Sequence, residues 1–129
     1  MTQATPQATP NTTLFICATC GMVKDPTTGQ KPNNPAAEAL ATNTAALLAN
    51  TPVSVQLTKC LSLCTQPIAW ALSGPSRHAT SFAPATCAED LATTAQLYLS
   101  TPVGEKMPKK DLPKEVKPTL ISRIPPLKF

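Results

Sequence analysis

Five cysteines stand in this chain, and four of them form two close pairs. Two residues separate Cys17 from Cys20, and three residues separate Cys60 from Cys64. A single Cys-x-x-Cys motif occurs by chance and in several chemistries, whereas two close cysteine pairs in a small chain are more specific. Clustered thiolates repel one another, and a bound cation removes that cost while it adds metal–sulfur bonds. The two pairs therefore predict one metal centre held by four thiolates.

Tetrahedral sulfur coordination is typical of zinc and of iron–sulfur clusters, and the spacing alone does not choose between them. A structural zinc usually joins segments that are too small to fold alone, whereas this chain has strands and helices enough for a core. We therefore favour a [2Fe-2S] cluster, with backbone amides of residues 18–21 and 61–65 as hydrogen-bond donors, and keep zinc as the alternative. The leading hypothesis is an electron-transfer protein, and the second is a non-enzymatic metal carrier or interaction module.

The thiols also allow a role without any metal. A redox-active dithiol at Cys17 and Cys20 would follow the first strand, but no helix begins within the motif to lower a thiol pKa. It also leaves Cys60 and Cys64 without a role. Buried cysteines are common core residues, but four would have to coincide in paired loops. Cys87 stands in the first turn of a predicted helix, where the helix dipole favours a thiolate, although packing is the commoner role.

Catalytic side chains are scarce in this sequence. No Ser-His-Asp set and no pair of carboxylates stands at a plausible spacing, so nothing supports hydrolase chemistry. The lone His78 lies in a polar segment, where a loop histidine is commoner than a metal ligand. Trp70 is most simply a core residue. We therefore expect an electron carrier or a metal-binding protein rather than an enzyme.

The elements that position the thiols follow from the apolar pattern. Residues 13–17 form a short apolar run typical of a central strand, and residues 53–57 alternate like a half-buried strand. Residues 36–50 predict a helix that starts after an N-cap at Asn34 and a first-turn Pro35. Because a helical crossover makes the two strands parallel, the cysteine pairs that follow them are expected to meet at one edge of the sheet.

The second half of the chain predicts two more strands and one more helix. Residues 68–72 and 79–82 predict the strands of a hairpin, and a capping box at Thr86 and Glu89 opens a helix that ends near Ser100. The order β-α-β-β-β-α predicts an α/β fold, in which helices pack on a small mixed sheet.

Length and composition indicate one domain with additions at both ends. The 129 residues are 14% charged and 4% aromatic, so small aliphatic side chains must build the core. Residues 1–12 lack the basic and apolar blocks of a secretory signal and predict a disordered leader before a metal-binding domain at 13–104. No apolar run reaches the roughly 20 residues of a membrane span. The expected location is the cytoplasm, where thiols stay reduced.

Residues 105–129 form a basic tail that carries the whole net charge of +4. Its lysines predict docking of an acidic protein redox partner. Because aromatic residues are not interleaved with them, nucleic-acid binding is not expected. Pro108, Pro113 and Pro118 predict an extended tail. Its apolar end is suited to dock on the domain or on another chain, which allows a homodimer; it comprises Leu120, Ile121, Ile124, Leu127 and Phe129.

Several segments together resemble a family of small bacterial proteins of unknown function. They are residues 13–20, 60–64, 68–75, 89–91, 97–98 and 121–126. The family is described as predicted metal-binding proteins related to thioredoxin-like [2Fe-2S] ferredoxins and often linked to cobalamin biosynthesis. The resemblance implies a thioredoxin-like fold and a cluster bound by Cys17, Cys20, Cys60 and Cys64. In such ferredoxins a longer loop separates the first two ligands than the Cys-x-x-Cys motif found here.

Overall fold

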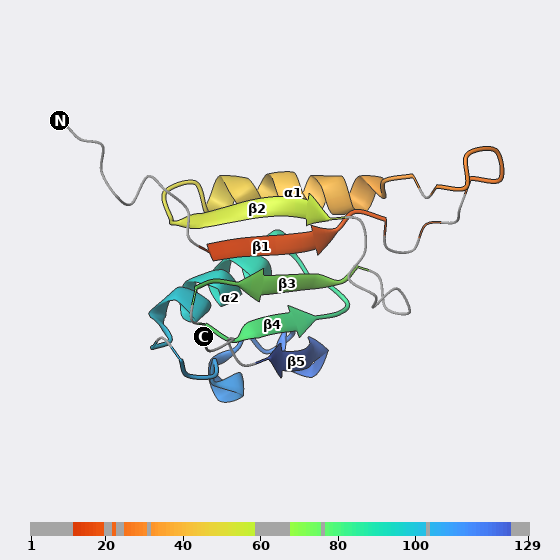
Figure 1. Ribbon diagram of the computed structural model, residues 1–129. Helices are drawn as coiled ribbons and strands as arrows, with labels where there is room; N and C mark the ends of the chain where they lie inside the picture. Colours follow the sequence, from red (N-terminus) through yellow and green to blue (C-terminus); the bar gives the residue numbers. More distant parts are fainter. Residues whose placement is uncertain are drawn as a thin grey trace.

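A five-stranded mixed sheet forms the centre of the protein (Figure 1). The computed structural model describes residues 12–19, 22, 25–30, 32–58, 68–75, 77–102 and 104–124. The strands are β1 (Thr12–Cys17), β2 (Val53–Thr58), β3 (Trp70–Ser73), β4 (Ala79–Phe82) and β5 (Leu120–Ile124). They lie in the order β2-β1-β3-β4-β5, and β1 pairs with β2 in parallel while the other pairs are antiparallel. The predicted α/β fold with a parallel first pair is confirmed.

Two helices pack against each other on one face of this sheet (Figure 1). They are α1 (Pro35–Leu47) and α2 (Ala88–Ser100). The start of α1 is as predicted, because the side-chain oxygen of Asn34 accepts a hydrogen bond from the amide of Ala36 at 2.9 Å. Each helix has 13 residues. In the described part of the chain, no helix has the length and apolarity that crossing a membrane requires.

The start of α2 differs from the prediction. Its N-cap is Cys87, which makes no side-chain capping hydrogen bond, so the capping box of Thr86 and Glu89 is wrong. Instead, the hydroxyl of Thr86 donates a hydrogen bond to the carboxylate of Asp90 at 2.8 Å. Glu89 and Asp90 both lie in the first turn, where negative charge interacts favourably with the helix dipole.

The core lies between the helices and the sheet. Leu14 and Ile16 of β1 are fully buried and belong to one apolar cluster with Leu91 of α2. The rings of Trp70 and Phe82 stack within this cluster, with their centroids 4.3 Å apart and their planes at 15°. Aromatic pairs of this kind add stability beyond the area that they bury. Trp70 is thus a core residue, as predicted.

The chain after residue 104 differs from the expected extended tail. Residues Lys109–Asp111 and Lys117–Thr119 form short 3-10 helices. Three apolar side chains of the segment are buried in the same core as the strands, namely Met107, Leu112 and Val116. Leu120–Ile124 then adds β5 to the free side of β4, so the apolar end docks on its own domain. Leu127 and Phe129 lie outside the described residues.

The guanidinium of Arg77 caps the carboxyl end of α2. Its Nη1 donates hydrogen bonds to the carbonyl oxygens of Tyr98 and Thr101 at 2.8 Å and 2.6 Å, and its Nη2 donates to that of Leu99 at 3.2 Å. It also lies over the Tyr98 ring, 5.7 Å from the ring centroid. The last carbonyls of a helix lack the usual partners within the helix, and the guanidinium supplies donors to three carbonyl oxygens at this end.

Replacing Arg77 by Lys should lower the free energy of unfolding by about 1 to 2 kcal/mol, because a single ammonium nitrogen cannot reproduce the hydrogen bonds that the two guanidinium nitrogens donate. Urea unfolding followed by circular dichroism measures the change. The exposed Lys114, replaced by Ala, is the matched control and should leave the midpoint nearly unchanged. Equal urea midpoints for the Arg77→Lys variant and the unmodified protein would show that these guanidinium hydrogen bonds add no stability.

Ionisation of Tyr98 should make the free energy of unfolding depend on pH in the alkaline range. Burial raises the pKa of Tyr98 to about 12, an effect that the positive charge of Arg77 partly opposes. The Tyr98 hydroxyl also donates a hydrogen bond to the carbonyl oxygen of His78 at 2.6 Å. The unfolded chain ionises near the ordinary value of about 10. The folded state therefore favours the neutral phenol. The contribution of Tyr98 to the free energy of unfolding is complete below about pH 10 and is lost as the pH rises to about 12.

The variant Tyr98→Phe tests this pH dependence. The free energy of unfolding of the unmodified protein should fall more steeply between about pH 10 and pH 12 than that of the variant. Urea titrations at several alkaline pH values provide both slopes. Parallel slopes would refute the assignment to Tyr98.

Candidate metal centre

Cys17 is the last residue of β1 and is fully buried. It packs with Ala69 and Ala83, and its amide donates a hydrogen bond to the carbonyl oxygen of Ala69 at 2.9 Å. Leu14 and Ile16 face the helices, so the alternation of a strand places Cys17 on the opposite face of the sheet. Ala69, Ala83 and Ile68 thus enclose the thiol at the end of β1, an interior strand of the sheet.

The parallel register brings the ends of β1 and β2 to one edge. Cys17 pairs with Thr58, the last residue of β2. The amide of Ala18 donates a hydrogen bond to the carbonyl oxygen of Thr58 at 2.7 Å, which extends the pairing by one residue. The prediction that both cysteine-bearing segments leave the sheet at a common edge is therefore confirmed for the strand ends. Ala18 was also predicted to donate to cluster sulfur, and this is wrong because its amide hydrogen already bonds to Thr58.

The amino-terminal end of α1 lies at the same edge (Figure 1). The amide of Asn34, the N-cap residue, donates a hydrogen bond to the carbonyl oxygen of Ala18 at 2.6 Å. The positive end of a helix dipole favours nearby thiolates. The N-cap signal at Asn34 was readable from the residues, but its position beside Cys17 was missed because the two residues are distant along the chain.

The remaining predicted ligands, Cys20, Cys60 and Cys64, lie outside the described residues. The convergence of all four thiols accordingly stays a prediction. Within the described ranges, no group of three or more His, Cys, Asp or Glu side chains is placed to hold a metal ion. Those ranges contain only Cys17 of the four candidate ligands.

Comparison with known proteins decides the family. A family model described as "Protein of unknown function (DUF1636)" matches residues 14–126. The chain belongs to the DUF1636 family. No curated protein matches it. Metal binding and a link to cobalamin biosynthesis, which the resemblance implied, stay predictions for this DUF1636 protein.

The DUF1636 chain is similar in structure to a thioredoxin-like [2Fe-2S] ferredoxin from Aquifex aeolicus. The TM-score is 0.54 and the sequence identity 14%, and the match covers 93% of this chain and 99% of the ferredoxin. At this identity the likeness shows the fold. The thioredoxin-like architecture that the resemblance implied is therefore confirmed for this DUF1636 protein.

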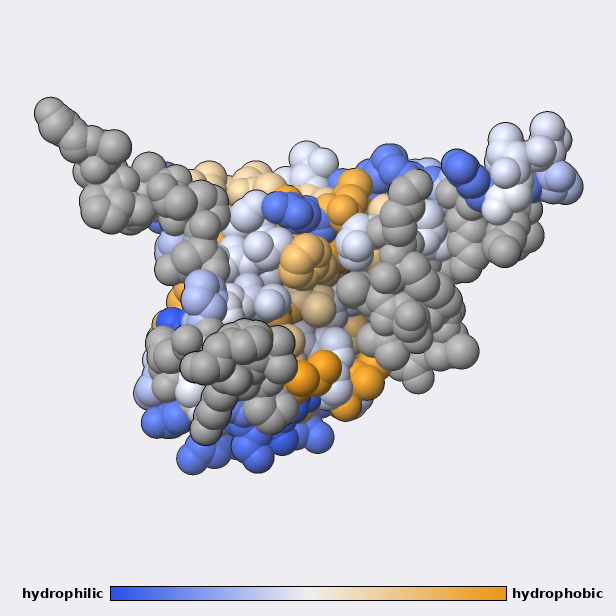
Figure 2. Space-filling model, in the orientation of Figure 1, coloured by the Kyte–Doolittle hydropathy of each residue, from blue (hydrophilic) through white to orange (hydrophobic). Residues whose placement is uncertain are grey.

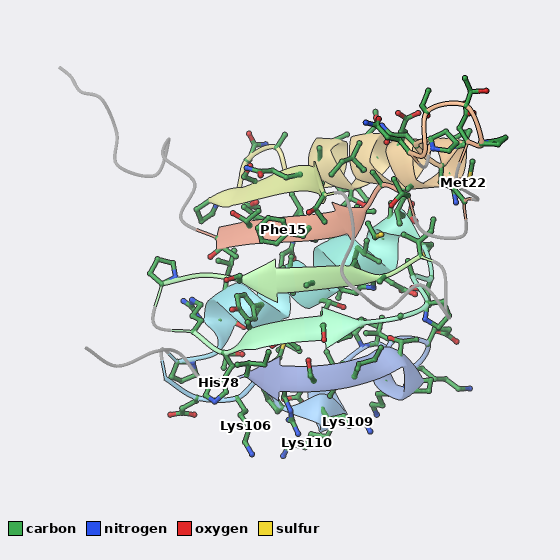
Figure 3. All side chains as sticks on the ribbon, turned by 45° about the vertical axis from the view of Figure 1, so that its right-hand side comes forward. Phe15, Met22, His78, Lys106, Lys109 and Lys110 are labelled. Atoms are coloured by element: carbon green, nitrogen blue, oxygen red, sulfur yellow. The ribbon has the colours of Figure 1, made fainter. Side chains whose placement is uncertain are left out.

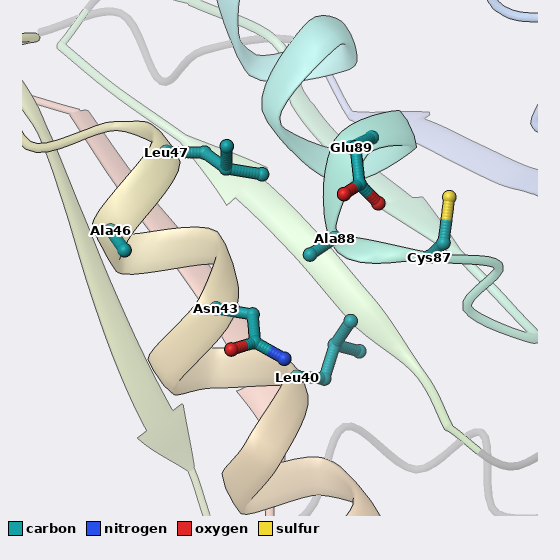
Figure 4. A pocket seen from close by; sticks show the side chains of 7 residues that line it. All are labelled: Leu40, Asn43, Ala46, Leu47, Cys87, Ala88 and Glu89. Atoms are coloured by element: carbon teal, nitrogen blue, oxygen red, sulfur yellow. The ribbon is translucent and has the colours of Figure 1, made fainter.

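Cys87 of the DUF1636 protein lies apart in a second environment. It is exposed at the N-cap of α2, beside a cavity of about 450 Å³ between the two helices (Figure 4). The backbone amide of Asp90 favours the thiolate, but partial burial and the carboxylates of Asp90 and Glu89 outweigh it and raise the pKa of Cys87. The raised pKa runs against the expectation that the helix dipole favours a thiolate here, and the exposure of the side chain contradicts the alternative that it is packed.

His78 does not belong to the site around Cys17. It immediately precedes β4, and the register pairs Thr80 with Leu72 and Leu72 with Leu14. His78 therefore stands at the end of the sheet opposite to the end that holds Cys17, and Figure 3 shows it at the lower rim. Its Nδ1 atom is buried without a hydrogen-bond partner in the described part of the chain. His78 lies in a loop, as predicted.

Proposed function

We propose that this DUF1636 protein is a one-electron carrier that holds a [2Fe-2S] cluster on Cys17, Cys20, Cys60 and Cys64. The observation that supports it best is the pairing of Cys17 with Thr58 at the ends of two parallel strands. Neighbouring strands lie about 4.8 Å apart, so the two cysteine-bearing segments start within a few ångströms of each other.

The segment that carries Cys60 and Cys64 begins and ends beside Cys17. The residue described before it, Thr58, pairs with Cys17. The residue described after it, Ile68, packs against the side chains of Cys17, Ala69 and Ala83. Two residues reach at most about 7 Å and four reach at most about 14 Å. Cys60 is two residues after Thr58 and Cys64 four residues before Ile68. Chain length therefore keeps both thiols within reach of a centre at Cys17.

The described surroundings fit thiolate ligation. Burial of Cys17 among alanines excludes water from its sulfur, and the amino-terminal end of α1 beside Ala18 favours the negative charge of a thiolate centre. A bound [2Fe-2S] cluster would supply reversible one-electron transfer. The chain itself would hold the ligands, limit solvent access and so set the potential. The thioredoxin-like [2Fe-2S] ferredoxin with the same fold supports this by analogy.

Absorption and metal content test the proposal directly. Protein isolated anaerobically should absorb visible light, contain iron and acid-labile sulfide in equal amounts, and bleach reversibly with dithionite. Colourless protein with one zinc per chain would instead identify the metal-binding module that the spacing also allows. Colourless protein without either metal after anaerobic reconstitution would refute a metal centre.

A thiol–disulfide oxidoreductase is a further candidate function. The observation that favours it is the position of the α1 N-cap beside Ala18, because a helix amino terminus next to a Cys-x-x-Cys motif lowers a thiol pKa. This function predicts turnover in an insulin-reduction assay by the reduced protein. It also predicts that Cys60→Ser keeps this activity, since only Cys17 and Cys20 would react.

A further inference from the structure

We propose that the outer edge of β5 binds an extended, acidic segment of a partner protein by strand addition. Among the described strands, β5 is last in the sheet and pairs only with β4. An edge strand presents backbone amide and carbonyl groups that an extended peptide can pair with. This inference depends on β5 and the charges around it, and it goes beyond the electron-carrier proposal because it needs no cluster.

A groove runs along this strand. A cavity of about 360 Å³ is lined by Leu120, Ile121, Ser122 and Arg123 of β5 and, on its other side, by the lysines at positions 106 and 109. Figure 3 shows the two lysines together with Lys110 at the rim below β5. Residues of an edge strand and three cationic side chains thus line the same space.

No carboxylate among the described residues lines the groove itself. Glu105 and Asp111 line a neighbouring cavity beside the end of α2, and Lys106 lines both cavities. In the part of the chain that the structure describes, Lys106, Lys109 and Arg123 form no ion pair; Arg123 donates a hydrogen bond from Nη1 to the carbonyl oxygen of Met107 at 3.3 Å. In Figure 2 the rim of the molecule below β5 is strongly hydrophilic. Unpaired cations attract carboxylates of a partner.

Apolar side chains on β5 provide the second element of recognition. Ile121 is 46% exposed and Ile124 59% exposed. A partner segment that alternates acidic and apolar residues would place carboxylates near the lysines and apolar side chains on the isoleucines. A second copy of this chain carries the same positive groove, so like charges oppose self-pairing of two β5 edges. An acidic partner is therefore favoured over a homodimer at this edge.

Peptide binding tests the docking surface. A fluorescein-labelled decapeptide of alternating Glu and Val should bind the full chain saturably at low salt, measured by fluorescence anisotropy. The double variant Lys106→Glu/Lys109→Glu should weaken binding by at least about tenfold. The control Lys114→Glu/Lys117→Glu makes the same change of charge outside the cavity and should weaken it by less than about threefold. Equal loss in both variants, or no binding to the unmodified protein, would overturn the proposal.

Backbone pairing is tested separately from charge. The same decapeptide, N-methylated at alternate backbone nitrogens, keeps its carboxylates but loses hydrogen-bond donors, and its affinity should fall by at least about tenfold. Hydrogen exchange at residues 120–124 should slow with the unmethylated peptide only. Equal affinity of both peptides would exclude strand addition, and tighter binding of a single-stranded oligonucleotide of equal charge would exclude an acidic protein partner. The visible spectrum of the same sample reports the metal centre, so either proposal can fail alone.

Discussion

Replacing Cys60 by Ser should remove the visible absorption of the protein and lower its iron and acid-labile sulfide content by at least about tenfold. A serine hydroxyl stays protonated near neutral pH and is a poor substitute for a thiolate, so a four-cysteine site loses one bond and one compensating charge. Spectra and metal analysis after anaerobic reconstitution measure both quantities. Thermal unfolding of the variant separates loss of the cluster from loss of the fold.

The matched control is Cys87→Ser. Cys87 is exposed at the start of α2, and its raised pKa disfavours a thiolate, so its replacement should leave the spectrum and iron content unchanged. Loss of colour in both variants would point to general instability rather than ligation. Unchanged iron content in the Cys60→Ser variant would remove Cys60 from the ligand set and contradict the proposed centre.

Replacing Trp70 by Ala should lower the free energy of unfolding by about 3 to 5 kcal/mol. Trp70 is 1% exposed, and the change deletes its stack on Phe82 and leaves a cavity in the core. Since the free energy of unfolding of small domains is about 5 to 15 kcal/mol in total, this loss is a large share of the stability. Urea unfolding measures the loss, and Trp70→Phe provides a milder variant in case the alanine protein does not fold.

The control for Trp70 is Ile121→Ala. Ile121 is the same kind of large apolar residue but is half-exposed on β5, so its truncation should change the free energy of unfolding by no more than about 0.5 kcal/mol. A similar loss for both variants would mean that the cluster around Trp70 is not the main source of stability.

The amino-acid sequence by itself determined the local elements and their first pairing. The apolar runs at residues 13–17 and 53–57 and the cap at Asn34 depend on neighbouring residues only, so β1, β2 and the start of α1 were predicted within one residue. The right-handed crossover rule then required parallel strands. The meeting of the two strand ends at Cys17 and Thr58 followed from these two facts.

The start of α2 and the structure of the residues after 104 were predicted less well, because both depend on contacts beyond the local sequence. Thr86 and Glu89 fit the capping pattern, but the backbone places the N-cap at Cys87, and Thr86 bonds to Asp90 instead. The residues after 104 have no regular apolar period between their prolines. Burial of Met107, Leu112 and Val116 therefore could not be read from spacing.

Only the tertiary structure decided which distant groups meet. β5 completes the sheet through pairing with β4, about 40 residues earlier in the chain, and the hydroxyls of Ser81 and Ser122 contact each other across that pair. Likewise, the hydrogen bond from Asn34 to Ala18 brings the end of α1 to Cys17. Local propensity follows from neighbouring residues, whereas such contacts depend on how the whole core packs, because their free energy is gained only after the chain between them has folded.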